Sequence, residues 1–319
     1  MSDQMLQVEI AGRRQAADDI ILLDLVPVAG AALPPFEPGA HVDVEVEPDL
    51  VRQYSLCGDP SRTDRYRLGI LLDPASRGGS AAIHRRFHVG ERIRIGRPRN
   101  NFPLAKDAAA TTLLGGGIGI TPLLAMAHHL HAIGLPFTLH YCARSRAKAA
   151  FLDELASAPY AGSVYLHFDD EDQAQHLDPA RDFPRADAGA HLYVCGPTGF
   201  MDWIIAAAGK LGFPDGQVHK EYFTAEVDTS GSAFEVELSQ SGQVVPVAAG
   251  QSIVAALKTV GVRVEVSCEQ GVCGTCLCNV LEGIPDHRDS YLTDDEKAGN
   301  DQMTLCCSRA KTPRLVLDL

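Results

Sequence analysis

The sequence lacks any run of about 18 consecutive apolar residues, so it predicts no membrane-spanning helix. Its N-terminus, MSDQMLQVEI, has no basic segment followed by an apolar core, so we expect no signal peptide and a cytoplasmic protein. Positive charge is also scarce, because 28 Lys and Arg stand against 41 Asp and Glu, a formal net charge of −13. Since an acidic protein repels phosphates, we expect no nucleic-acid partner.

The nine cysteines lack the even spacing of a disulfide framework. The first three are scattered, at Cys57, Cys142 and Cys195. The other six crowd into the last stretch of the chain, at Cys268, Cys273, Cys276, Cys278, Cys306 and Cys307. In a chain without a secretion signal, such a cluster indicates metal binding rather than cross-linking.

The cysteine loop has the spacing C-x4-C-x2-C, from Cys268 through Cys273 to Cys276. Another cysteine, Cys306, follows after 29 intervening residues. Four thiolates hold the two irons of a plant-type [2Fe–2S] cluster. The two glycines of the loop accept positive φ and let backbone N–H groups approach the cluster sulfides. The loop therefore predicts an iron–sulfur site.

Two alternatives stay open at this loop. A zinc site is the first, although zinc sites usually combine two short C-x2-C hooks and no second hook lies at a suitable distance. The second concerns the fourth ligand, because Cys307 adjoins Cys306. The spacing in plant-type ferredoxins favours Cys306. Cys278, which has apolar neighbours, is expected to be an interior strand residue.

The first hundred residues predict a small antiparallel β-barrel, because short alternating or β-branched runs are separated by turn residues. These runs lie at Gln7–Ile10, Ile20–Val26, His41–Val46, Tyr66–Leu72 and Arg92–Ile95. One helix is expected after the segment Arg77-Gly78-Gly79-Ser80. The free N–H groups at the start of that helix could hold a phosphate.

Near Pro103 the pattern changes to alternating strands and helices, which predicts a parallel α/β sheet. We expect strands at Thr111–Leu114, Phe137–Cys142, Val164–Phe168 and Leu192–Cys195, and a helix at Leu123–His131. Two glycine-rich turns follow strands, GGGIGITP from Gly115 and CGPTG from Cys195. Such turns let a pyrophosphate meet the backbone and a helix N-terminus, and two of them define a cleft at the carboxyl edge of the sheet.

The segment Asp228–Ser232 predicts a linker to a third region. There we expect strands at Phe234–Leu238 and Val244–Val247, a helix at Ile253–Val260 before the cysteine loop, and a closing strand at Arg314–Leu317. The chain length of 319 residues agrees with two or three domains.

Together these motifs resemble the ferredoxin–NADP reductase superfamily and, over nearly the whole chain, the phthalate dioxygenase reductase and vanillate O-demethylase reductase family. The matching segments occur in one order: RQYSL (52–56), GGS (78–80), GGGIGITPLL (115–124), YCARS (141–145), CGPTGFM (195–201), KEYF (220–223) and CEQGVCGTC (268–276). The resemblance implies a Greek-key antiparallel β-barrel that binds FMN at residues 1–103. It also implies a parallel α/β NAD-binding domain at 104–226 and a β-grasp ferredoxin domain at 233–319.

The resemblance further implies roles for individual residues. It places the FMN phosphate at Arg52, Gly79 and Ser80, and the flavin ring at Tyr54, Ser55, Ile70, Leu71 and Phe223. Thr121 would lie between flavin and nicotinamide. NAD would be bordered by Gly116, Gly117, Ala143, Arg144, Ser145, Cys195, Gly196 and Pro197. The cluster ligands would be Cys268, Cys273, Cys276 and Cys306.

Electron counting supports a flavin, because NADH gives two electrons together whereas a [2Fe–2S] cluster takes one. A flavin accepts the pair and releases electrons singly. Hydride transfer itself needs no catalytic acid or base, so none is predicted, and Cys195 is expected to line the pocket rather than act as a nucleophile. Asp170, within the acidic run 169–172, would accept ribose hydroxyls and favours NADH. Arg144 and Arg146 could instead hold the 2′-phosphate of NADPH.

The resemblance implies an enzyme that passes electrons from NADH through FMN and [2Fe–2S] to a Rieske-type oxygenase, either an aromatic-ring dioxygenase or an O-demethylase. Two alternatives stay open: a reductase that serves a cytochrome or another acceptor, and a zinc-stabilised nucleotide-binding module without redox activity. We expect a monomer, because an electron carrier meets its partner transiently.

Overall fold

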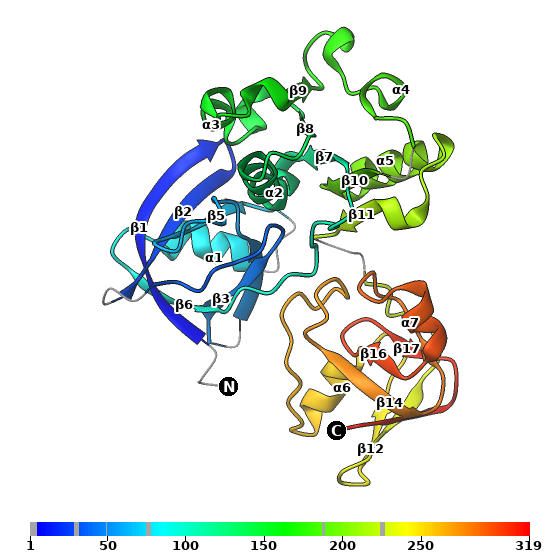
Figure 1. Ribbon diagram of the computed structural model, residues 1–319. Coiled ribbons are helices and arrows are strands. Elements are labelled where there is room, and N and C mark those ends of the chain that lie inside the picture. The colour runs from blue at the N-terminus through cyan, green and yellow to red at the C-terminus, as the bar shows by residue number, and fades with distance from the viewer. Residues whose placement is uncertain (1–4, 29–31, 49, 75–77, 187–188, 224–226) are drawn as a thin grey trace. The chain divides into compact units, whose positions relative to one another are not determined.

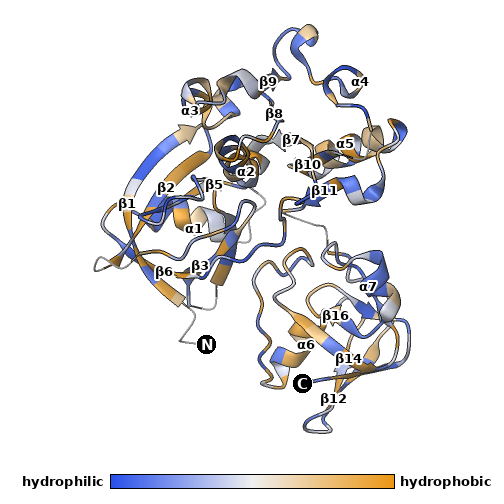
Figure 2. Cartoon of the chain, in the orientation of Figure 1, coloured by the Kyte–Doolittle hydropathy of each residue, from blue (hydrophilic) through white to orange (hydrophobic). Residues whose placement is uncertain are grey.

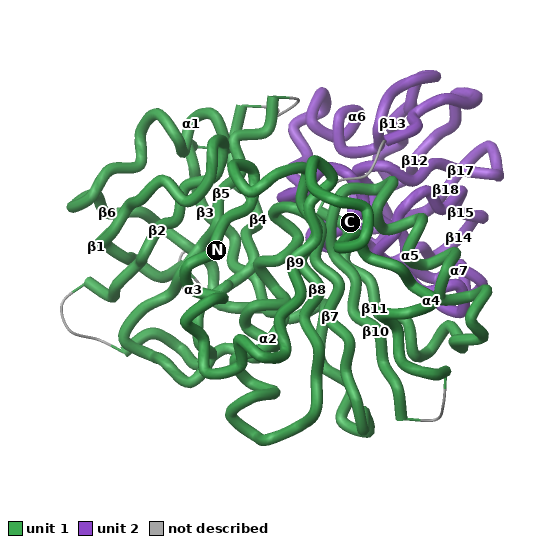
Figure 3. Tube along the Cα trace, turned by 90° about the horizontal axis from the view of Figure 1, so that it is seen from above, with its two compact units in different colours: residues 1–223 green, residues 224–319 purple. Residues whose placement is uncertain are grey.

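The structure, a computed structural model, describes residues 5–28, 32–48, 50–74, 78–186, 189–223 and 227–319. Arg77, expected before the first helix, lies outside these residues. The chain divides into two compact units, unit 1 (residues 1–223) and unit 2 (residues 224–319), which Figure 3 colours separately. In the described ranges, no helix is long and apolar enough to cross a membrane.

The first part of unit 1, blue to cyan in Figure 1, is an antiparallel sheet in the order β4-β3-β6-β1-β2-β5. A backbone bridge between Leu56 and Leu68 joins its two edges into a barrel. Its strands are β1 (Met5–Ala17), β2 (Ile20–Pro27), β3 (His41–Glu47), β4 (Leu50–Ser55), β5 (Tyr66–Leu71) and β6 (Arg92–Gly96), and its helix is α1 (Gly79–Arg86). Leu23 of β2 faces the barrel core, whereas Leu22 packs against the second part of the unit. Burial on both faces explains the continuous apolar run in β2.

The second part of unit 1 is a parallel sheet in the order β11-β10-β7-β8-β9. Its strands are β7 (Ala110–Gly116), β8 (Phe137–Ala143), β9 (Val164–Phe168), β10 (Ala190–Cys195) and β11 (Val218–Glu221). The helices are α2 (Ile120–Ala132), α3 (Leu152–Ser157), α4 (Pro179–Asp182) and α5 (Thr198–Lys210), with short 3₁₀ turns η3 (Gly117–Gly119), η4 (Arg146–Lys148), η5 (Ala161–Ser163), η6 (Gln173–Gln175) and η7 (Asp215–Gln217). Leu113 packs in the core with α2, and its neighbour Leu114 packs with α5, so helices cover both faces.

Unit 2 is a mixed sheet in the order β13-β12-β18-β14-β16 beside a small β15-β17 pair. Its elements are β12 (Phe234–Leu238), β13 (Val244–Val247), α6 (Ile253–Thr259), β14 (Leu277–Glu282), β15 (Pro285–Asp286), α7 (Asp294–Gly299), β16 (Gln302–Thr304), β17 (Arg309–Ala310) and β18 (Arg314–Leu317). β12 and β18 are parallel neighbours. The apolar side of α6, orange in Figure 2, adds Ile253, Ala256 and Leu257 to the core of the unit.

The predicted fold class is confirmed: an antiparallel barrel, a parallel α/β sheet and a mixed C-terminal sheet. The predicted strands coincide with observed strands, and the predicted helix at Ile253–Val260 ends one residue earlier, at Thr259. The sequence-based prediction omitted β11, the short strands β15, β16 and β17, and α7. The predicted linker Asp228–Ser232 contains neither helix nor strand. The boundary between residues 103 and 104 lies inside unit 1 and stays a prediction.

Candidate functional site

Four cysteine side chains meet in unit 2, three from the loop between α6 and β14 and the fourth, Cys306, from the turn between β16 and β17. The sulfur of Cys268 is within hydrogen-bonding distance of Cys273 and Cys306, and the sulfur of Cys276 is within the same reach of Cys306. All four residues are buried, and none of them forms a disulfide. Four thiols gathered at one point are a suitable donor set for an iron–sulfur cluster or for zinc.

Cys307 has different surroundings from those four. Its sulfur contacts Cys306, but it also lies 3.2 Å from the Thr304 hydroxyl and 3.9 Å from the Ser308 hydroxyl. Cys278 lies on the buried side of β14, where its thiol donates to the Asn279 carbonyl. The structure therefore brings Cys306 together with the close trio and surrounds Cys307 partly with hydroxyl groups.

The backbone of the loop is shaped by two glycines with positive φ, 72° at Gly271 and 70° at Gly274. A Cβ at Gly271 would lie 2.4 Å from the Cys307 sulfur, and a Cβ at Gly274 would lie 2.2 Å from the Tyr291 ring. The loop can therefore close only with glycine at these positions. The amide of Gln270 also points at the Cys268 sulfur at 3.3 Å, and such donors favour the thiolate form.

In unit 1, the predicted phosphate residues converge at the start of α1. The side chain of Arg52, on β4, lies over Gly79, because a Cβ there would be 2.7 Å from Arg52 Cγ. The helix begins after Gly78, which has φ 91° and provides no side-chain cap, so the first N–H groups are uncapped by a side chain. Ser80 is buried, and its hydroxyl accepts a hydrogen bond from the Asp73 amide. A cation beside a helix N-terminus fits a phosphate.

The predicted flavin-ring residues occupy neighbouring parts of unit 1. Tyr54 and Ser55 end β4, and Ile70 and Leu71 end β5, which contacts β4. Burial raises the pKa of Tyr54 above its usual range, so its phenol stays neutral. Phe223 follows β11 and packs, partly buried, against the same core as Leu71.

Thr121 marks the contact between the barrel and the parallel sheet. Its methyl group would be 2.9 Å from a Cβ at Gly69 of β5. The glycine-rich turn is therefore in close contact with the strand that carries Ile70 and Leu71. The Thr121 hydroxyl donates to the Ile118 carbonyl at 2.9 Å, and the residue is 2% exposed. This threonine therefore holds the turn against the barrel.

The predicted nucleotide residues gather at the carboxyl edge of the parallel sheet. Strand register aligns Cys195 of β10 with Gly115 of β7, and Gly116 with Cys142 of β8. A Cβ at Gly119 would lie 2.2 Å from the Cys195 carbonyl oxygen. The two glycine-rich turns are thus in contact, and the edge includes Gly116, Gly117, Ala143, Arg144, Ser145, Cys195, Gly196 and Pro197.

The acidic run after β9 is exposed, including Asp170. Its neighbour Glu171 accepts a hydrogen bond from Arg146 at 2.6 Å. The same guanidinium stacks on the Phe168 ring at 4.6 Å. Arg146 is therefore already paired. Of the two arginines that the sequence suggested for the 2′-phosphate of NADPH, the other is Arg144, which follows β8 and is exposed.

Glu221, the last residue of β11, was given no role by the sequence-based prediction although it lies within the KEYF motif. It is the register partner of Cys195, and its Oε2 atom is buried without a hydrogen-bond partner among the described residues. Burial raises the pKa of Glu221 to about 8. Burial, with Glu221 beside it, also holds the pKa of the Cys195 thiol well above its usual range, which agrees with a lining thiol and not with a nucleophile.

Phe200, on the first turn of α5, was also missed. A Cβ at Gly116 would lie 2.8 Å from the Phe200 ring, and a Cβ at Gly196 would lie 2.9 Å from it. The ring therefore rests on both glycine-rich strand ends. Gly196 is only four positions from Phe200, but no local sequence signal predicts the contact with Gly116, which lies 84 positions away.

Two protein-family models match separate parts of the chain. Residues 113–205 match the oxidoreductase NAD-binding domain, and residues 236–311 match the 2Fe-2S iron-sulfur cluster binding domain. The first match contains both glycine-rich turns, and the second contains the whole cysteine loop.

Characterised relatives align with the full length of the chain. It is 49% identical over 317 residues to the vanillate O-demethylase oxidoreductase of Pseudomonas sp. (strain HR199 / DSM 7063), covering 99% of this chain and 100% of the relative. It is 40% identical over 320 residues to the phthalate dioxygenase reductase of Burkholderia cepacia, covering 99% and 98%. The solved structure of a phthalate dioxygenase reductase aligns with a TM-score of 0.77 at 40% identity, covering 100% of this chain and 99% of that one.

A larger protein contains a similar segment as one part. The structure of an intact type IV self-sufficient cytochrome P450 monooxygenase aligns with a TM-score of 0.87 at 38% identity, covering 99% of this chain and 41% of that one. The four thiols fit an iron–sulfur cluster, and the Arg52 side chain beside the uncapped start of α1 fits the phosphate of a flavin nucleotide. The chain therefore belongs to the family of phthalate dioxygenase reductase and vanillate O-demethylase oxidoreductase, and it is an NADH-dependent oxidoreductase whose cofactors are FMN and a [2Fe–2S] cluster.

Proposed function

We propose that this chain is the reductase component of a Rieske-type oxygenase system and delivers electrons from NADH to the oxygenase one at a time. The observation that carries the proposal is the full-length identity of 49% to a vanillate O-demethylase oxidoreductase. A second relative, 45% identical over 304 residues, is named phenoxybenzoate dioxygenase subunit beta, from Ectopseudomonas oleovorans. We further propose that the protein acts as a monomer in the cytoplasm, where NADH is available.

In this proposal the FMN phosphate binds between the Arg52 guanidinium and the uncapped start of α1 at Gly79 and Ser80. The support is the close approach of Arg52 to Gly79, which places a cation next to free N–H groups. The ring would lie along Tyr54, Ser55, Ile70 and Leu71, with Phe223 over one face. A neutral, partly buried Tyr54 avoids placing a charge against the ring.

The nicotinamide nucleotide would bind across the carboxyl edge of the parallel sheet. The N–H groups at the start of α2 and α5 would meet its pyrophosphate, beside Gly116, Gly117, Gly196 and Pro197. Ala143, Arg144 and Ser145 would border it, and Asp170 would accept its ribose hydroxyls. Thr121 would stand between the two rings, because its turn already presses on β5. The pairing of Arg146 with Glu171 favours NADH over NADPH.

The cluster would be held by Cys268, Cys273, Cys276 and Cys306. The support for Cys306 is its sulfur, which is in reach of both Cys268 and Cys276. When bound, the flavin supplies the step between two-electron and one-electron transfer. The chain itself binds and orients the donor, keeps Cys195 protonated beside it and excludes water from the buried strand ends.

The decisive experiment is NADH-driven reduction of candidate Rieske oxygenases by the purified protein. We expect a spectrum with flavin and iron–sulfur bands that NADH bleaches, followed by reduction of the matching oxygenase. Cys273→Ser should lose the iron and the transfer to the oxygenase but keep flavin reduction by NADH. Cys278→Ser is the matched control, a buried thiol of the same unit outside the loop, and should keep both. A colourless protein with one zinc would contradict the proposal.

A cytochrome P450 is the second candidate acceptor. The support is the alignment with 41% of a self-sufficient P450 chain, in which a module like this one is part of a P450 protein. Anaerobic mixing of the NADH-reduced protein with a Rieske oxygenase or with a P450 separates the two. Fast reduction of the Rieske protein and slow reduction of the haem supports the first acceptor, and the reverse order supports the second.

A further inference from the structure

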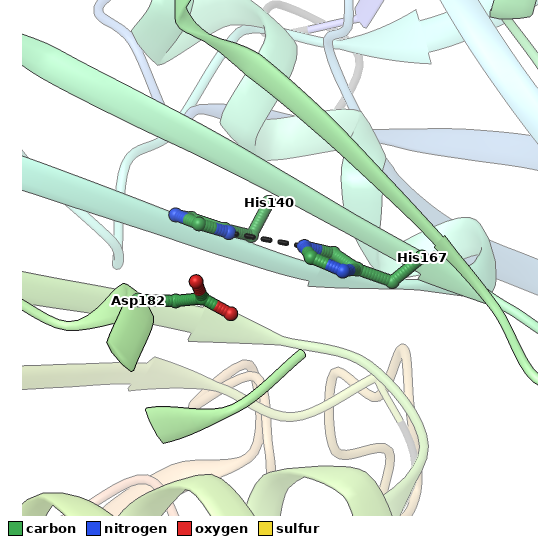
Figure 4. A group of neighbouring side chains, drawn as sticks. All are labelled: His140, His167 and Asp182. Atoms are coloured by element: carbon green, nitrogen blue, oxygen red, sulfur yellow. Dashed lines mark hydrogen bonds between the residues drawn. The ribbon is translucent and has the colours of Figure 1, made fainter. Parts of the chain in front are cut away.

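A compact group of metal-ligating side chains lies outside the cofactor sites described above. It consists of His140 on β8, His167 on β9 and Asp182 at the end of α4, and Figure 4 shows the three side chains directed toward one another. One possible ligand atom from each lies within 4.8 Å of the others, and, apart from the four thiols of unit 2, no other such group occurs among the residues that the structure describes. His140 is 3% exposed and His167 is 7% exposed.

The hydrogen bonds fix where the lone pairs lie. His167 Nδ1 is 2.5 Å from the Gln175 carbonyl, which can only accept, so this nitrogen carries the proton. The lone pair of His167 is therefore on Nε2, which lies 3.1 Å from His140 Nδ1. A histidine that donates one N–H to a backbone carbonyl and presents the other nitrogen has the arrangement typical of metal ligands.

His140 completes the pair from the neighbouring strand. Its Nδ1 donates to His167 Nε2, which leaves a lone pair on its own Nε2, a buried atom with no hydrogen-bond partner in the described part of the chain. If a cation replaced the shared proton between the rings, the proton would move to Nε2. That atom is unpartnered in either tautomer, so the exchange leaves no additional buried polar atom unpaired.

We propose that His140, His167 and Asp182 bind one zinc ion, with water as the fourth ligand. Two nitrogens 3.1 Å apart fit a zinc ion at about 2.0–2.1 Å from each, with an angle of roughly 100° at the metal. Asp182 receives its hydrogen bonds from Arg181 and from the Asp178 amide, which leaves lone pairs for the metal. Because a ligand atom of Asp182 lies within 4.8 Å of those of both histidines, a change of its side-chain rotamer would bring the carboxylate to the metal.

Such an ion would stabilise the conformation of the segment that follows β9. This segment carries the acidic run at 169–172 and then Gln175, whose side chain bonds both backbone groups of Phe168. The zinc would tie α4, at the end of the segment, to β8 and β9. We therefore assign the site a positioning role for the acidic run, and zinc binding itself does not depend on the proposed function.

The chain contains a natural control for this site. His191 on β10 and His219 on β11 also lie on adjacent parallel strands, with a 2.8 Å contact between Nδ1 and Nε2 and nearly parallel rings. No carboxylate completes that pair among the described residues, because they contain only the one group of three. The two pairs therefore separate metal binding from simple histidine pairing.

The test is zinc titration of the holoprotein, with zinc and iron counted together by elemental analysis. We expect one zinc per chain in the wild type and in His219→Gln, and an affinity at least roughly tenfold weaker in His140→Gln and in Asp182→Asn. Zinc should also raise the melting temperature of the wild type but not of His140→Gln. Asp182 is the less buried ligand, so Asp182→Asn serves if His140→Gln fails to fold.

Iron counting distinguishes zinc at this site from zinc at the cysteine loop. If the zinc content per chain increases only as the iron content falls, the zinc is bound by the thiols, and the proposal is overturned. Equal zinc affinity in the wild type and in Asp182→Asn, or no binding in either, also overturns it and makes His140 and His167 a hydrogen-bonded structural pair. NADH-dependent flavin reduction, measured in parallel, reports the proposed function separately.

Discussion

At the fourth thiol of the cysteine loop, two adjacent residues could serve as the ligand. The Cys306 sulfur is in reach of two thiols of the close trio, whereas that of Cys307 also contacts the hydroxyls of Thr304 and Ser308. We therefore expect Cys306→Ser to lose the iron and its visible bands and Cys307→Ser to keep them. Iron counting and absorption spectra of the two purified variants check this. Loss of iron in Cys307→Ser alone would reverse the assignment.

The buried carboxyl of Glu221 predicts a pH-dependent stability difference. Its pKa is raised from 4.5 to about 8 in the folded chain, so the unfolded chain releases the proton first as the pH rises. The neutral carboxyl makes its full contribution to the free energy of unfolding below pH 4.5, and this contribution is lost as the pH rises to about 8. Glu221→Gln should therefore gain stability relative to the wild type across this range, as measured by denaturant unfolding.

The difference in the free energy of unfolding between the wild type and Glu221→Gln reports on this one carboxyl, because the two chains share every other titrating residue. If the difference for Glu221→Gln stayed flat with pH, the carboxyl would be ionised in the folded protein across this range.

At the residue scale, sequence reasoning predicted what local spacing encodes. Cys268, Cys273 and Cys276 lie within nine residues, so their convergence follows from the loop. Two other contacts arise from pairing between strands. Glu221 lies beside Cys195, 26 positions away in the sequence, and His167 lies beside His140, 27 positions away. Strand order and register decide such contacts, and a single sequence does not encode them locally.

At the scale of elements, the close approach of two turns makes Gly119 irreplaceable. A Cβ there would lie 2.2 Å from the Cys195 carbonyl oxygen and 2.6 Å from the Gly196 nitrogen, both backbone atoms that cannot rotate away. We expect Gly119→Ala to lower the free energy of unfolding by about 1–3 kcal/mol and to weaken NADH binding. Urea unfolding and KM for NADH measure the two effects.

Gly209 is the matched control for that variant, because it lies inside α5 with nothing within 4 Å of its Cβ position. Gly209→Ala should raise the free energy of unfolding by about 0.5–1 kcal/mol, since alanine loses less backbone entropy in a helix. If Gly119→Ala were as stable as Gly209→Ala, the turns would not be in contact.

Long apolar elements were predictable and short polar ones were not. The sequence segments that form β2 and β7 are continuously apolar because both faces of each strand are buried. β11 reads Val-His-Lys-Glu and is held to the sheet edge through its pairing with β10. The short helix α7 did have a readable signal, the capping box of Thr293 and Glu296, which the prediction overlooked.

At the scale of the whole molecule, each unit has its own core. The apolar clusters of unit 1 contain no described residue beyond Phe223, and the cluster of unit 2 contains only residues from Val227 onward. A chain that ends at Phe223 should therefore fold, bind FMN and accept electrons from NADH. It should contain no iron, because all four proposed ligands lie in unit 2.

That truncated chain gives the sharpest test of the electron path. We expect NADH to bleach its flavin as fast as in the full chain, while reduction of the oxygenase is lost, because the cluster that would pass electrons from the flavin to the oxygenase is missing. Ferricyanide, which can accept electrons without the cluster, is the control acceptor and should be reduced by both chains. A truncated chain that reduced the oxygenase at the full rate would show that electrons leave from the flavin, and unit 2 would then serve docking rather than transfer.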